Sequence, residues 1–71
     1  MTPALPVVIY PPAADGGRRV RAGDRFVGMA YTLLDVAEFL NRAGMEGVEA
    51  SDVAAAEWIE WRGGGPRVWE P

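Results

Sequence analysis

The sequence contains no cysteine, histidine or lysine, and all seven of its basic side chains are arginine. Without cysteine there is no disulfide framework, no thiolate-ligated metal site and no cysteine nucleophile. Without histidine the chain lacks the usual base of a catalytic triad and the commonest metal ligand. Without lysine neither a Schiff base nor a phosphate-loop lysine can form. We therefore expect a protein that is not an enzyme and that needs no metal and no cofactor.

What remains is typical of an ordinary folded domain. Of the 71 residues, 49% are hydrophobic and 24% are charged, which predicts a single domain over 1–71. The ends, 1–6 and 66–71, are candidates for flexible segments. No apolar run approaches the ~18 residues that a membrane span needs, so we expect a cytoplasmic protein. The net charge of −3 favours solubility and argues against general nucleic-acid affinity.

Proline and glycine divide the N-terminal part of the chain into strands. The run Val7–Tyr10 lies between prolines, and because proline cannot donate to a ladder, this run is predicted to be an edge strand. A hairpin is predicted over Arg18–Tyr31, with its turn at Gly23. Both faces of its second strand are apolar, which favours a central position. Gly28 indicates a bulge or a close approach of another element.

The strongest local signal is a helix over 33–43, because apolar side chains recur there at helical spacing. Thr32 is a good N-cap, and Asp35 can reach back as in a capping box. Gly44 stands where a helix ends in a left-handed residue. A second, shorter helix is expected at about 52–57, followed by a strand over 58–62.

These elements predict an α+β fold: a small antiparallel sheet of three to four strands, including the N-terminal hairpin, with one main helix packed on one face and a short second helix. A winged-helix arrangement is the alternative, but it needs three helices.

The three tryptophans are the most informative side chains. Large aromatic residues anchor cores, and they are also enriched at protein interfaces, so at least one of them is a candidate for contact with a partner. An edge strand could in addition accept a strand from another chain. The sequence therefore favours a small interaction module that binds another protein or itself, as a homodimer. Its candidate binding residues are Val7, Ile9, Tyr10, Trp58, Trp61 and Trp69.

The alternative function is a small regulatory protein that binds nucleic acid through the arginine-rich hairpin. The arginines concerned are Arg18, Arg19, Arg21 and Arg25. Two-stranded ribbons can enter the DNA major groove, where arginine reads guanine. The acidic net charge argues against this alternative. The Gly63–Gly65 run is interpreted as a turn, because no lysine and no helix follow it as a phosphate loop requires.

Several segments carry a resemblance, among them Val8–Pro12, Gly16–Arg21, Phe39–Gly44 and Ile59–Pro66. They are similar to short uncharacterised proteins of GC-rich actinobacteria, over most of the chain. The resemblance implies a bacterial, cytoplasmic protein, and it implies no activity, cofactor or binding site.

Overall fold

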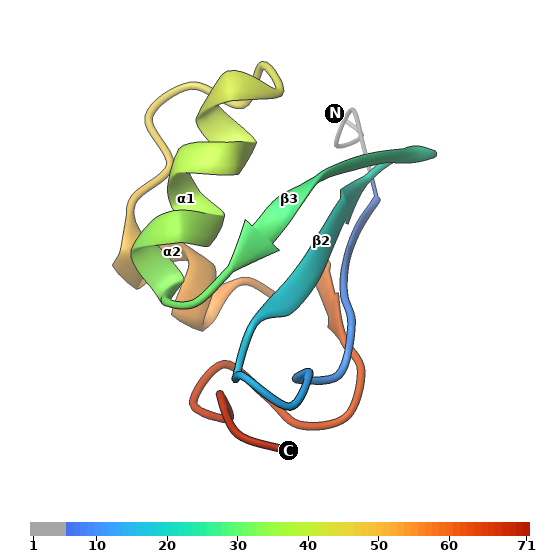
Figure 1. Cartoon of the computed structure of the whole chain (residues 1–71). Coiled ribbons are helices and arrows are strands. Elements are labelled where there is room, and N and C mark those ends of the chain that lie inside the picture. The colour runs from blue at the N-terminus through green and yellow to red at the C-terminus, as the bar shows by residue number, and fades with distance from the viewer. Residues whose placement is uncertain (1–5) are drawn as a thin grey trace.

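The computed structural model describes residues 6–71 as an α+β domain with a four-stranded mixed sheet (Figure 1). In chain order the elements are β1 (Val7–Ile9), β2 (Arg18–Ala22), β3 (Arg25–Ala30), α1 (Leu33–Arg42), α2 (Ala50–Ala55) and β4 (Ile59–Trp61). The strand order across the sheet is β3-β2-β1-β4. Figure 1 shows both helices on the same side of this sheet. The predicted fold class, with one main helix and a short second one, is confirmed.

The prediction that the first strand lies at an edge is wrong. β1 lies between β2, with which it is antiparallel, and β4, with which it is parallel. The prolines do not prevent this position, because they flank the three-residue ladder instead of interrupting it. All three residues of β1 are buried, and a short run that is apolar on both faces is typical of an interior strand. The parallel β1–β4 pair makes the sheet mixed and not wholly antiparallel.

The hairpin of β2 and β3 is confirmed, but its second strand is an edge strand and not a central one. One apolar face of β3 packs on α1, and the other apolar face is left exposed. The ladder shifts register between Val20 and Arg21. Nearby, Gly28 has φ of 154°, and a Cβ built on it would lie 2.7 Å from Cζ of Phe39. Gly28 therefore marks both a bulge and a close approach of the helix, as its position in the sequence indicates.

The termini of α1 follow local rules. The Thr32 hydroxyl accepts a hydrogen bond from the Asp35 amide at 3.1 Å. At the other end the amide of Met45 donates to the carbonyl of Leu40, and that of Gly44 to the carbonyl of Asn41. These two bonds form a Schellman motif.

The second helix begins earlier in the chain than the sequence indicates. α2 starts at Ala50, and its N-cap is Glu49. The Asp52 carboxylate accepts a hydrogen bond from the Glu49 amide at 2.9 Å, so Asp52 closes the first turn from inside the helix.

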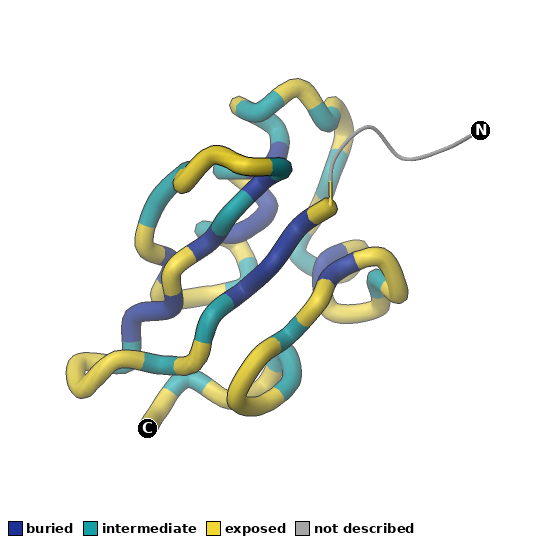
Figure 2. Tube along the Cα trace, turned by 90° about the vertical axis from the view of Figure 1, so that its right-hand side faces the viewer, coloured by how far each residue is buried: buried dark blue, intermediate teal, exposed yellow. Residues whose placement is uncertain are grey.

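The core lies between the helices and the sheet. It is built from the inward side chains of the strands and from the helix residues that face them, namely Val7, Ile9, Val20, Ala30, Val36, Ala37, Leu40, Val53 and Ile59. Figure 2 shows buried stretches along the strands of the sheet. One charged residue, Arg18, is buried together with them.

Candidate functional site

Arg18, predicted as part of a nucleic-acid surface, has no exposed surface at all. Its guanidinium group makes five hydrogen bonds, which use all five of its N–H donors. The acceptors are the carbonyl oxygens of Tyr10, Arg62, Gly64, Gly65 and Val68, at 2.6–2.9 Å. Within residues 6–71 no carboxylate forms an ion pair with it. Burial lowers the pKa of Arg18 below its ordinary value, but arginine stays charged.

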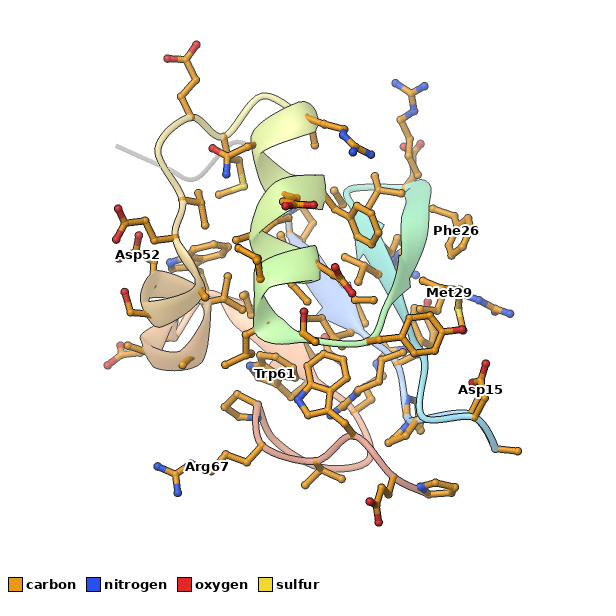
Figure 3. All side chains as sticks on the ribbon, turned by 60° about the vertical axis from the view of Figure 1, so that its left-hand side comes forward. Asp15, Phe26, Met29, Asp52, Trp61 and Arg67 are labelled. Atoms are coloured by element: carbon orange, nitrogen blue, oxygen red, sulfur yellow. The ribbon has the colours of Figure 1, made fainter. Side chains whose placement is uncertain are left out.

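Two of the three tryptophans complete the surroundings of Arg18. Its Cζ lies 5.2 Å from the ring centroid of Trp61 and 5.6 Å from that of Trp69. The Trp69 indole N–H donates to the carbonyl of Pro66 at 2.8 Å. These contacts hold the C-terminal segment against β2, so Trp61 and Trp69 stabilise the fold itself. Figure 3 shows Trp61 between α1 and the C-terminal segment.

The glycine run Gly63–Gly65 supports this arrangement. Gly63 and Gly64 have φ of 77° and 118°, values that favour glycine. A Cβ on Gly63 would lie 2.6 Å from Cβ of Pro11. The loop directs carbonyl oxygens, and not amide groups, at a charged group. The glycine loop therefore binds a cation through its carbonyl oxygens, whereas a phosphate-binding loop binds an anion through its amide groups.

The opposite face of the sheet has no helix on it. Because side chains alternate along a strand, the residues between the core positions point to this side. They are Val8, Tyr10, Arg19, Arg21, Phe26, Met29, Glu60 and Arg62, and we call this set the uncovered face because no helix covers it. Val8, at its centre, is nevertheless buried. Phe26 is 58% exposed and Met29 37%, and Figure 3 shows both on the far side of β3 from α1. Residue Tyr31, beside Met29, is also exposed.

Tyr10 lies at the centre of the arginines of the uncovered face. The Cζ atoms of Arg62, Arg21 and Arg19 lie 5.2, 5.8 and 5.9 Å from its ring centroid. Arg21 also donates to the Tyr10 hydroxyl at 2.9 Å, and Arg19 lies 5.7 Å from the ring centroid of Phe26. Such cation–π contacts fix long, flexible side chains in place.

The charges on the uncovered face differ in how far they are paired. Arg62 forms an ion pair with Glu60. The hydrogen bond that Arg62 donates to the Glu60 carboxylate raises the pKa of Arg62 above its ordinary value. Arg19 makes no hydrogen bond or ion pair to another residue of 6–71 through its side chain. It is therefore the cation on this face that remains available to a partner.

The residues predicted from the sequence do not form one surface. Val7 and Ile9 are in the core, whereas Tyr10 lies on the uncovered face. Trp58, 36% exposed, precedes β4 and lines a hollow beside α2.

The predicted arginines separate in the same way. Arg18 is buried, Arg19 and Arg21 lie on the uncovered face, and Arg25 lies near the last turn of α1. Sequence reasoning missed Phe26 and Met29 as surface residues. The sequence did contain a signal for these two residues, since the strand that contains them is apolar on both faces and only one face can pack on the helix.

The comparisons with known proteins identify no relative. Protein-family models, curated proteins and solved structures all give no significant match to the chain. Residues 6–71 contain no group of three or more acidic side chains placed to hold a metal ion. Their helices are too short and too polar to cross a membrane.

Proposed function

We propose that the chain is a non-enzymatic binding module that associates with another protein through the uncovered face. The observation that carries the proposal is the pair Phe26 and Met29, which are left exposed on a sheet face that no helix covers. A domain of this size needs most of its large apolar side chains for its own core, so two of them left on one face support a role in binding. Aromatic residues, methionine and arginine are the side chains enriched at protein interfaces.

Docking by strand addition has less support than docking on the face. The strand first considered for it, β1, already has a neighbour on each side. The edge strand β3 is irregular beside Gly28, and bulges oppose the pairing of edges. The other edge strand, β4, has only three residues.

The charges of the uncovered face indicate the chemistry of the partner. The face carries three guanidinium groups and one carboxylate, and that carboxylate is paired with Arg62. A partner surface with apolar side chains and a carboxylate opposite Arg19 would match it. Nucleic-acid binding would rest on Arg19 and Arg21 alone, and Arg21 already donates to Tyr10.

The experiment compares two serine variants of equally exposed residues. Phe26→Ser changes the uncovered face, and Leu34→Ser changes α1, where Leu34 is 57% exposed against 58% for Phe26. Proteins captured by the full-length chain are quantified for the wild type and both variants, with and without nuclease. Each protein retained is then purified and titrated against the three chains.

We expect a partner that binds wild type and Leu34→Ser alike and binds Phe26→Ser about thirtyfold more weakly, as for an interface hot spot. A partner that both variants bind equally well would refute the proposal. Capture that nuclease abolishes would favour the arginine alternative. Sedimentation of the chain alone tests whether its partner is a second copy.

A further inference from the structure

A pocket of about 380 Å³ lies between the turn of the β2–β3 hairpin and the last turn of α1. Phe39, Val27 and Ala43 are half-buried and form its apolar part, whereas Arg25, Arg42 and Asp24 are exposed at its opening. Its volume is within the range of small-ligand sites. The pocket lies on the helix side of the sheet and takes only Phe26 from the uncovered face.

The aromatic wall of the pocket is held in a fixed position. The Phe39 ring lies against the backbone of Gly28, where any Cβ would lie 2.7–3.0 Å from ring atoms. Gly28 has a backbone conformation that favours glycine, with φ of 154°. β3 therefore approaches α1 closely at this point, and the outer end of the Phe39 ring lies against the strand. A preformed apolar wall of this kind is typical of small-molecule sites.

The two cations at the opening come from different elements and have no anionic partner. Arg25 is on β3 and Arg42 on α1, and neither side chain forms a hydrogen bond or an ion pair with another residue of 6–71. Asp24 lines the same opening without pairing with either of them. Guanidinium groups bind carboxylates and phosphates through two parallel N–H···O bonds.

We propose that this pocket binds a small anionic ligand with a ring-sized apolar body and an oxyanion head group. The body packs on Phe39 and Val27, and the head group, a carboxylate or a phosphate, is bound by Arg25 and Arg42. The pocket chemistry requires both parts of the ligand. A purely apolar ligand would leave the two cations unpaired, and a bare anion would leave the apolar wall in contact with water.

The test is a titration of the full-length, 15N-labelled chain with 2-naphthoate, 2-naphthyl phosphate and the neutral 2-naphthamide, followed by amide chemical shifts. We expect saturable shifts at residues 22–27 and 39–43 with at least one of the two anions. The affinity ratio of the two anions then identifies the preferred head group. The amide should bind at least about tenfold more weakly, because it has no negative charge and only one acceptor oxygen for the arginines.

Matched variants test the role of the two arginines. Arg42→Gln and Arg25→Gln should each weaken binding of the anions about tenfold or more. Arg67→Gln removes the same charge from the C-terminal segment, far from Phe26 in Figure 3, and should leave binding unchanged. The same spectra report whether each variant is folded.

Three results would overturn the proposal. The first is equal binding of 2-naphthamide and 2-naphthoate. The second is shifts that lie outside the pocket or are absent. The third is wild-type affinity in both pocket variants. Phe26 belongs to both sites, but none of these results measures binding of a protein partner, so the two proposals can fail separately.

Discussion

Replacing Arg18 with methionine tests whether a buried cation holds the C-terminal segment in place. Methionine keeps a long unbranched stem but removes the charge and all five hydrogen bonds. Breaking a buried charged network costs about 3–5 kcal/mol. A chain of 71 residues has a total stability of roughly 4–10 kcal/mol. We therefore expect Arg18→Met to lose about half of the free energy of unfolding.

The assay is urea unfolding followed by tryptophan fluorescence, since Trp61 and Trp69 lie against Arg18 and report on its surroundings. Hydrogen exchange adds spatial detail. Amide protection in 62–69 should fall more in the variant than protection in α1, because four of the five lost hydrogen bonds and the ring contact with Trp69 involve this segment. Arg67→Met is the matched control. Arg67 is an exposed arginine of the same segment, so its loss should change stability by no more than about 0.5 kcal/mol.

Arg18→Lys separates charge from hydrogen bonding. Lysine keeps the positive charge but has three donors in place of five, so at least two of the carbonyl oxygens lose their partner. We expect a loss of about 2–4 kcal/mol. If Arg18→Met cost less than about 1 kcal/mol, or left protection of 62–69 unchanged, the role assigned to Arg18 would be refuted.

Three further predictions concern single contacts. Gly28→Ala should lower the urea midpoint and cost about 1–3 kcal/mol, because a methyl group would clash with the Phe39 ring; an unchanged midpoint would contradict the close packing. Thr32→Ala removes the N-cap acceptor of α1 and should cost about 1 kcal/mol in the same assay. The pKa of Asp15 is lowered below 3.8, mainly by the hydrogen bond from the Gly17 amide and secondly by the one from the Tyr31 hydroxyl. The hydrogen bond to Asp15 also raises the pKa of Tyr31 above 10.0. Its contribution to stability is lost as pH falls through the lowered pKa of Asp15 or rises through the raised pKa of Tyr31, so the melting temperatures of wild type and Tyr31→Phe should differ at neutral pH and converge at both extremes.

Local signals in the sequence predict local structure well. The helix over 33–43 and its two termini depend on side chains within one or two turns of each other, and the structure has α1 at Leu33–Arg42. The position of β1 depends instead on β4, which follows it in the chain only after the hairpin and both helices. Proline around Val7–Ile9 indicates where the strand ends, but it contains no information about the neighbours of the strand.

The role of Arg18 could have been found by strict alternation. If Arg19 and Arg21 share one face of β2, then Arg18 shares the other face with Val20, an apolar residue that points to the core. Grouping the arginines by their proximity in the sequence hid this difference. The acceptors of Arg18 could not have been predicted in the same way, because most of them are backbone carbonyls more than 40 residues away.

The same strand therefore serves two purposes on its two faces. On the inner face Arg18 orders the C-terminal segment by donating hydrogen bonds to carbonyl oxygens that would otherwise need water as their donor. In this short chain these bonds take the place of apolar packing. On the outer face Arg19 and Arg21 hold Tyr10 within the uncovered face. Arg62 links the inner and the outer face of the sheet, since its carbonyl oxygen accepts a hydrogen bond from Arg18 and its guanidinium group lies over the ring of Tyr10. The geometry of the proposed binding surface thus depends on a buried cation that no partner can touch.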